Sequence, residues 1–253
     1  MIKIQKFQQA LGLGATVALM AGAAALSLSP VTSSASTVNN GTFDSGVVTG
    51  LYNTGTDNSG NLLSNGSSAA PYSLTSAPQG QETSLAVFSS GGYPGNDWVG
   101  ADNYSEWIAP TAGQAYTGSP ATYGLPGAYE FQTTFTSSKA GIVTISGKWA
   151  TDNYSDSMQI NSDGVISIVP TSGYTAFSAF TITGNIVSGV NTLDFYITNL
   201  TTSTNTDGAN PTGLRVEFTS VVPLPVPATG VLTLIGSLAF AGGLVLRRLA
   251  KIR

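Results

Sequence analysis

The tetrapeptide Asp-Asn-Tyr-Ser occurs twice in this 253-residue chain, at positions 102–105 and 152–155, and an acidic residue follows each copy. Carboxylate and amide oxygens are the ligands that Ca²⁺ prefers, and the ion takes six to eight of them. The candidate calcium ligands are Asp102, Asn103, Asp152, Asn153 and Asp156. Asp and Asn also form turns, because their side chains hydrogen-bond the nearby backbone. We favour the turn interpretation and expect no cofactor beyond this candidate structural calcium.

The tyrosine of each copy suggests a second chemistry. Sugar-binding sites stack aromatic rings on the sugar and use polar neighbours for its hydroxyls. Tyr104 and Tyr154 are therefore candidate sugar-binding residues, and core packing is an equally open alternative for both. For Trp107 and Trp149 we favour core packing, since Trp149 falls on the apolar face of a predicted strand.

A third chemistry would be glycoside hydrolysis, which requires two carboxylates flanking a groove. The acidic residues available for it are Glu106, Glu130, Asp152 and Asp156. Their spacing selects no pair, so we predict a protein that is not an enzyme. The chain has no His and no Cys. This excludes a Ser-His-Asp triad, a His general base and a His/Cys zinc site.

The predicted body between the two chain ends is strongly acidic. It contains three cations, Lys139, Lys148 and Arg215, against thirteen acidic residues, which makes its net charge −10. Such a surface cannot neutralise a row of phosphates, so nucleic acid is excluded as a partner. Because the chain has no cysteine, no disulfide can stabilise the fold, which therefore depends on a hydrophobic core. The predicted body is long enough to form one.

Alternating apolar and polar residues predict β-strands in this body. The clearest runs lie at 129–135, 143–149, 193–197 and 214–218, and turn residues separate them. Many short strands with regular turns indicate an all-β fold, an antiparallel β-sandwich of the jelly-roll type. We place its core at 93–221, preceded by a Gly/Ser/Asn-rich part at 36–92.

The N-terminus has the layout of a secretory signal peptide at 1–35. Lys3 and Lys6 precede an apolar stretch, and small residues at 33–35 predict cleavage after Ala35. The Sec machinery and signal peptidase are thus expected partners. At the other end, an uncharged apolar stretch at 228–246 is long enough to span a bilayer as a helix. It is followed by Arg247, Arg248, Lys251 and Arg253, which places the end in the cytoplasm and the body outside.

The proline motif Val222-Pro223-Leu224-Pro225 before this predicted span completes a tripartite signal at 222–253. The order resembles the C-terminal sorting signal of PEP-CTERM proteins in its VPLP-type variant, although Leu224 stands where the commonest pattern has Glu. The resemblance implies processing by an exosortase-type sorting protease in a Gram-negative bacterium. The protein would then occupy the inner membrane transiently and end at the cell surface or in the extracellular matrix. A plain single-span anchor is the alternative.

The body also resembles the recurrent ectodomain of PEP-CTERM proteins, through "SEWIAP", "GAYEFQTTF", "ISGKWATDN", "VSGVNTLDFYITN" and "NPTGLRVEF". That resemblance implies a galactose-binding-like jelly roll. The leading functional hypothesis is a surface protein with a structural or adhesive role in the exopolysaccharide or biofilm matrix. A carbohydrate-binding module, with polysaccharide as the partner, and a carboxylate-dependent glycosidase are the alternatives.

Overall fold

The computed structural model describes residues 42–43, 45–81, 84–88, 98–100, 102–110, 124–163, 165–166, 173–201 and 210–224. The predicted signal peptide, the predicted span and its basic end lie outside these residues, as does Pro225. Among the described residues, no helix is long and apolar enough to cross a membrane.

The regular elements of the described chain are β-strands. The short strands are β1 (Thr42–Phe43), β2 (Val48–Thr49), β3 (Leu51–Tyr52), β4 (Tyr72–Ser76), β5 (Ala86–Phe88), β6 (Trp107–Ala109) and β10 (Val165–Ile166). The longer strands are β7 (Gly127–Ser137), β8 (Gly141–Asp152), β9 (Tyr154–Ile160), β11 (Ser178–Ile186), β12 (Gly189–Asn199) and β13 (Gly213–Leu224). The four clearest alternating runs of the sequence coincide with β7, β8, β12 and β13.

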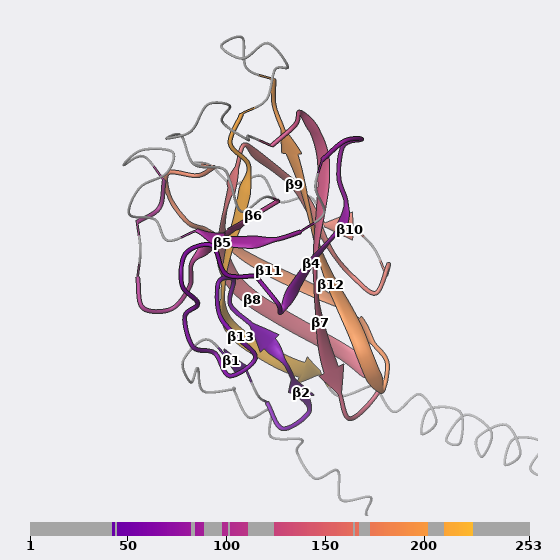
Figure 1. The fold of residues 1–253 in the computed structure, drawn as a ribbon. Coiled ribbons are helices and arrows are strands. Elements are labelled where there is room, and N and C mark those ends of the chain that lie inside the picture. Colours follow the sequence, from indigo (N-terminus) through magenta and orange to yellow (C-terminus); the bar gives the residue numbers. More distant parts are fainter. Residues whose placement is uncertain are drawn as a thin grey trace, which may run out of the picture. The chain divides into compact units, whose positions relative to one another are not determined.

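Two antiparallel sheets make up the fold (Figure 1). The first sheet has the order β10-β9-β12-β7-β2, with β4 also paired to β7, and the second has the order β11-β8-β13-β6-β5. The longer strands alternate between the sheets along the chain, so that β7, β9 and β12 lie in the first and β8, β11 and β13 in the second. This alternation is the connectivity of a jelly-roll sandwich and confirms the predicted fold class. A separate pair joins β1 and β3.

The core lies between the two sheets, because alternate residues of each long strand point into the same layer. Phe131 and Phe135 of β7 face this core, as do Phe195 of β12 and Ile145 and Trp149 of β8. Trp149 is fully buried, with its ring 6.1 Å from that of Phe195. The core position predicted for Trp149 is thereby confirmed.

A second, smaller hydrophobic cluster covers the outer face of the second sheet. Its members are Ala86, Phe88, Trp98, Trp107, Ala109 and Ala150. These residues alternate along β5, β6 and β8 with residues of the main core, such as Val87 and Ile108. The rings of Trp98 and Trp107 pack against each other at an interplanar angle of 50°, with 4.2 Å between their centroids. Trp107 is therefore a core residue as predicted, although it belongs to this outer cluster.

Candidate functional site

The first Asp-Asn-Tyr-Ser copy forms a tight turn over the outer face of the second sheet, just before β6. Asp102 Oδ1 accepts hydrogen bonds from the backbone N–H groups of Tyr104, at 2.8 Å, and Ser105, at 3.1 Å. This is an Asx turn, the arrangement that the residue types favour. The turn interpretation is confirmed for Asp102.

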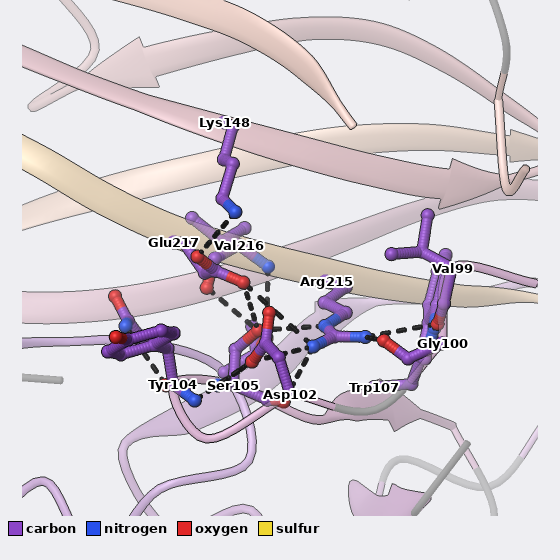
Figure 2. Close-up of polar contacts among 12 residues, drawn as sticks. Val99, Gly100, Asp102, Tyr104, Ser105, Trp107, Lys148, Arg215, Val216 and Glu217 are labelled. Carbon is purple, nitrogen blue, oxygen red and sulfur yellow. Dashed lines mark hydrogen bonds and ion pairs between the residues drawn. The ribbon is translucent and has the colours of Figure 1, made fainter. Parts of the chain in front are cut away.

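Arg215 of β13 anchors this turn (Figure 2). One of its terminal nitrogens lies 3.0 Å from Asp102 Oδ1, and the side chain is completely buried. The remaining guanidinium donors are also engaged. They reach Ser105 Oγ at 2.7 Å, the Ser105 carbonyl at 2.9 Å, the Val99 carbonyl at 3.0 Å and the Gly100 carbonyl at 2.6 Å. A buried guanidinium with this many acceptors holds the backbone carbonyls of residues 99, 100 and 105 in place.

Two further charges complete the network that Figure 2 shows. Glu217, two residues along β13, accepts a hydrogen bond from Ser105 Oγ at 2.9 Å and lies 2.8 Å from the Lys148 ammonium. The Phe177 ring covers both cations, at 4.3 Å from Lys148 Nζ and 5.1 Å from the Arg215 guanidinium carbon. The two cations thus stand beside two carboxylates, which limits the cost of burying charge.

The two carboxyls of the network differ in pKa. Burial raises the pKa of Asp102, but hydrogen bonds from Glu217, Tyr104 and Ser105 and the charge of Arg215 outweigh it, so the pKa lies below its ordinary value. For Glu217, burial dominates and the neighbouring Asp102 adds to it, so the pKa lies above its ordinary value despite Lys148. Asp102 is therefore the ionised partner of Arg215.

The second copy lies where the chain passes from one sheet to the other. Asp152 is the last residue of β8, and Asn153 connects it directly to Tyr154, the first residue of β9. Asn153 Oδ1 accepts the backbone N–H of Leu200 at 2.7 Å, which ties this corner to the end of β12. The Asp152 carbonyl accepts the Thr212 hydroxyl at 2.7 Å.

The Asp152 carboxyl is in a very different environment from that of Asp102. It is 97% buried, since its exposed fraction is 3%, and it accepts a hydrogen bond from Asn153 Nδ2 at 2.6 Å. Burial raises the pKa of Asp152 to about 8. The second copy therefore holds a carboxyl that is largely protonated at neutral pH.

These environments bear on the predicted calcium ligands. Asp102 Oδ1 faces a guanidinium and two N–H groups, which are donors that disfavour a cation at that oxygen. Within the described ranges, no three acidic residues gather as a metal site. The side chain of Asp156 lies outside the described residues, and Asn103 is exposed. The residues present do not fit one ion shared by both copies, and calcium at the second copy stays a prediction.

The tyrosines of the two copies differ from the tryptophans in their exposure to solvent. Tyr104 is 54% exposed and Tyr154 56% exposed, and they are the exposed aromatic side chains of the described residues. By contrast, Trp98, Trp107 and Trp149 are all buried. The structure thus decides the question that the sequence left open, since neither tyrosine packs in the core.

The segment 173–177 contacts the chain just before the first copy and lies close to the second copy. The Val99 N–H, at the base of the first turn, donates to the Tyr174 carbonyl at 2.8 Å, and the Tyr174 ring packs against Trp98. Gly173 is so close to the second copy that a Cβ there would lie 3.2 Å from the Asn153 carbonyl oxygen. Gly173 and Tyr174 therefore connect the chain before the first turn with the second copy.

The remaining acidic candidates are dispersed. Glu106 is buried immediately before β6, where its N–H donates to the Thr54 carbonyl at 2.9 Å. Glu130 is half-buried on β7 of the first sheet, opposite Tyr196. These two carboxylates stand on different sheets, so the structure does not present them as a pair.

The chain is similar to several solved structures, but no protein-family model and no curated protein matches it. Among solved structures, a family 35 carbohydrate binding module from Clostridium thermocellum is similar at 12% identity and a TM-score of 0.30, over 59% of this chain and 96% of that one.

Two other solved structures are similar to a comparable degree. A CBM35 in complex with a glucuronic acid containing disaccharide has 17% identity and a TM-score of 0.28, over 61% of this chain and 99% of that one. A carbohydrate binding module from Cellvibrio mixtus lichenase 5A, in complex with cellotriose, has 11% identity and a TM-score of 0.30, over 48% and 80%. These ligands are bound by those proteins.

Proposed function

We propose that this protein is a non-catalytic polysaccharide-binding β-sandwich that is exported and displayed at the cell surface. The observation that carries the proposal is the position of Tyr104 and Tyr154. They are the exposed aromatics of the described residues, and each belongs to one copy of the repeated motif. Rings held on fixed backbone can stack on the apolar face of a sugar at little entropic cost.

The backbone beneath both rings is well anchored. The Tyr104 N–H is bonded to Asp102, and the Tyr104 carbonyl accepts the amide of Asn53 at 3.0 Å. Tyr154 is the first residue of β9 and pairs with Thr198 of β12. A neutral glycan is the expected ligand, because the predicted body carries a net charge of −10 and repels polyanions.

Affinity electrophoresis of the full chain tests this function. The chain is kept in lauryldimethylamine oxide, which contains no sugar, and run through gels with hydroxyethylcellulose, xylan or galactomannan. We expect retardation by at least one of these, and a tenfold weaker apparent affinity for each Tyr→Ala change, equal to about 1.4 kcal/mol.

The matched controls are Tyr104→Phe and Tyr154→Phe, which keep the rings, and Val190→Ala, which changes a residue 67% exposed at another place. These three variants should bind like the unchanged chain. Binding that persists when both tyrosines are Ala, or no retardation in any gel, would contradict the proposal. Release of reducing sugar from the same polysaccharides would favour the glycosidase alternative instead.

Export and sorting are a second part of the proposal, supported by the leader at 1–35 and the tripartite signal at 222–253. The register of the second sheet places the Tyr154 corner far from the predicted tail along the strand. Gly213, at the start of β13, pairs with Asp152, whereas Leu224, the last described residue, pairs with Ile142. At about 3.3 Å per residue, the two positions lie about 35 Å apart along the strand.

A chain with an epitope tag inside the body tests the sorting in a host that has an exosortase. We expect a shortened, tagged body at the cell surface or in the medium, and full-length protein when the exosortase gene is deleted. Full-length protein in the inner membrane of both strains would contradict sorting and would favour the alternative of a plain single-span anchor. A structural or adhesive role in the exopolysaccharide layer follows if the released body stays with the matrix only when both tyrosines are present.

A further inference from the structure

The strand β11 lies at one edge of the second sheet. Its nine residues pair with β8 in one continuous register, and β8 is its only partner strand within the described chain. An edge strand exposes a row of backbone N–H and C=O groups, which can pair with a strand of another chain. β11 therefore offers a surface for strand pairing that the proposed sugar binding does not use.

The other terminal strands of the two sheets are short or covered. β2 and β10 have two residues each, and β4, beside β2, has five residues and an irregular register. β5 has three residues, and the segment 66–69 runs along it. Gly66 donates to the Val87 carbonyl, and Val87 donates to the Ser67 carbonyl, both at 2.9 Å. Among the described edges β11 is thus the long one, and proteins commonly protect such an edge with charges, proline or a bulge.

β11 carries none of these protections. Its sequence contains no charged residue and no proline, and its register with β8 has no bulge. Ala179, Thr181 and Thr183 are exposed on the outer face of the sheet, whereas Phe180 and Ile182 are buried in the main core. A neutral strand is also the place where two predicted bodies of net charge −10 approach with the least repulsion.

Asn185 shows which backbone groups of β11 point away from β8. Its N–H donates to Asp163 Oδ2 at 3.0 Å, and its C=O accepts a hydrogen bond from Asn161 Nδ2 at 3.2 Å. Both groups therefore point out of the sheet edge. Because every second residue of a regular antiparallel strand points the same way, the N–H and C=O groups of residues 179, 181 and 183 also point outwards.

The side chains shared by β11 and β8 support this assignment. The Thr183 hydroxyl lies 2.9 Å from that of Thr144, and the Thr181 hydroxyl lies 3.0 Å from that of Ser146. Side chains come closest in the antiparallel pairs that do not exchange backbone hydrogen bonds. The backbone groups of Thr181 and Thr183 are thus not used by β8.

The open part of the edge spans residues 179–183. Within the part of the chain that the structure describes, no hydrogen bond reaches the outward backbone groups of Ala179, Thr181 or Thr183. The outward groups of Asn185 are occupied, so the opening ends before it. Three residues, each with a donor and an acceptor, remain at regular spacing along the edge.

We propose that β11 docks against the same strand of a second copy of this chain, in antiparallel orientation around Thr181. Ala179 then lies opposite Thr183 of the second copy, and Thr181 lies opposite Thr181 of the second copy. Each such pair exchanges two backbone hydrogen bonds, because both residues point to the shared edge. The contact is self-complementary with a twofold axis at Thr181, so it closes as a dimer.

The charges beside β11 favour this partner and this orientation. Asp163 lies at the Asn185 end of the open edge, whereas Lys148 on β8 stands opposite Ala179 at the other end. Antiparallel docking brings the Asp163 end of one copy to the Lys148 end of the other, so opposite charges face each other at both ends. The Thr181 side chains of the two copies become neighbours, and such Thr–Thr pairs stabilise antiparallel strands.

Disulfide trapping tests the docking on the full chain, which contains no cysteine of its own. Residues that exchange backbone hydrogen bonds have Cα atoms about 5.5 Å apart, which is within disulfide range. The chain is oxidised in lauryldimethylamine oxide at about 0.15 M salt, which screens charges beyond about 8 Å. We expect Thr181→Cys to form a covalent dimer about ten times faster than Val190→Cys, a control at a position that is 67% exposed. Equal rates would overturn the proposal.

Ala179→Cys and Thr183→Cys test the register. In the docked pair these two positions lie opposite each other, whereas the cysteines of two identical variants are more than about 13 Å apart and cannot be bridged. A mixture of the two variants should therefore form the dimer, and each variant alone should link only as slowly as Val190→Cys. Single variants that link as fast as the mixture would contradict the antiparallel register.

Sedimentation velocity in the same detergent measures the docking without a covalent bond. Thr181→Lys and Thr181→Glu each place like charges on the twofold axis and should lower the dimer affinity about tenfold, whereas a mixture of the two should restore it. The matched control is Thr134→Lys, on an exposed position of β7 in the first sheet, which should dimerise like the unchanged chain. An unchanged chain that stays monomeric at its highest soluble concentration would contradict the proposal.

These experiments contain no polysaccharide, so their outcome does not depend on the proposed sugar binding. A docked pair carries two sets of Tyr104 and Tyr154, and two sites on one particle hold a polymer more tightly than one. Thr181→Lys should therefore reduce retardation in the polysaccharide gels, whereas Tyr104→Ala should leave disulfide trapping unchanged. Failure of one proposal can thus be distinguished from failure of the other.

Discussion

The two Asp-Asn-Tyr-Ser copies have identical residues in different environments. In the first, the carboxylate of Asp102 meets Arg215, and its pKa lies below the ordinary value. In the second, Asp152 is buried beside Asn153, and its pKa rises to about 8. Hydrogen bonds from Glu217 and Tyr104 and the charge of Arg215 lower the pKa of Asp102, whereas burial raises that of Asp152. The difference shows that the surroundings of each copy, and not the shared tetrapeptide, decide the charge of its carboxyl.

The sign of the pH dependence differs between the copies. A carboxyl whose pKa is lowered by folding contributes stability above its unfolded pKa, and the contribution is lost as pH falls through the folded value. Asp102 is of this kind. For Asp152, the unfolded chain ionises near pH 4 and the folded chain near 8, so stability decreases as pH rises between these values.

The largest effect is expected from Arg215→Met, which removes the anchor of the first copy. It leaves Asp102 and three backbone carbonyls without their donor, which should lower the free energy of unfolding by about 3–5 kcal/mol. Urea denaturation followed by tryptophan fluorescence measures this, since Trp98 and Trp107 lie beside the network. The control is Lys148→Met, whose side chain is 37% exposed and should cost less than about 1 kcal/mol. Equal losses of stability in the two variants would show that the buried pair of Arg215 and Asp102 does not anchor the first copy.

The same Asp→Asn substitution should change the free energy of unfolding in opposite directions in the two copies. Asp102→Asn removes the charge that faces Arg215 and should destabilise by about 2 kcal/mol at pH 7. Asp152→Asn keeps the acceptor for Asn153 and removes a buried acid, so it should stabilise by about 2 kcal/mol at pH 8. Denaturation curves between pH 5 and 8 measure both. The gain from Asp152→Asn should shrink towards pH 5, and a gain that does not depend on pH would argue against the raised pKa.

Replacing the exposed tyrosines should barely change stability. Tyr104→Ala and Tyr154→Ala each remove a ring that is more than half exposed, so the free energy of unfolding should change by about 0.5 kcal/mol or less. The melting temperature measures this on the same samples as the polysaccharide gels. A large stability loss at either position would mean that the ring packs in the fold, and weaker binding could not then be attributed to a lost contact.

The smallest effect is expected from calcium. Since Asp102 is neutralised by Arg215 and Asp152 holds a proton, millimolar Ca²⁺ or excess chelator should shift the melting temperature by less than about 1 °C. A stabilisation by Ca²⁺ that disappears in Asp152→Asn, and persists in Asp102→Asn, would instead assign a calcium site to the second copy.

Much of the fold could be predicted from the sequence, because strand periodicity is a local property. The alternation at 129–135 and 193–197 placed β7 and β12, and the apolar face of β8 placed Trp149 in the core. The extent of β13 was harder to see. Its last residues contain a proline and belong to the proline motif, yet they remain paired to β8 through Leu224.

The site was predictable only in part. The repeated motif singled out Tyr104 and Tyr154, but no local pattern told whether their rings were exposed. In the sequence, Arg215 differs from its surroundings only as one of three cations in the acidic body. The small number of cations is the one signal for its role that the sequence offers. Its contacts with Val99, Gly100 and Ser105 bridge more than a hundred residues of chain, a distance over which periodicity carries no information.

The sequence by itself determined the all-β class, the −10 charge of the predicted body and the excluded chemistries, because strand periodicity, formal charge and residue types require no knowledge of contacts. Only the tertiary structure decided which aromatic rings reach solvent and which carboxyl is ionised. These depend on burial and on partners that distant strands supply, and the two copies of one tetrapeptide show how far such surroundings can separate identical residues.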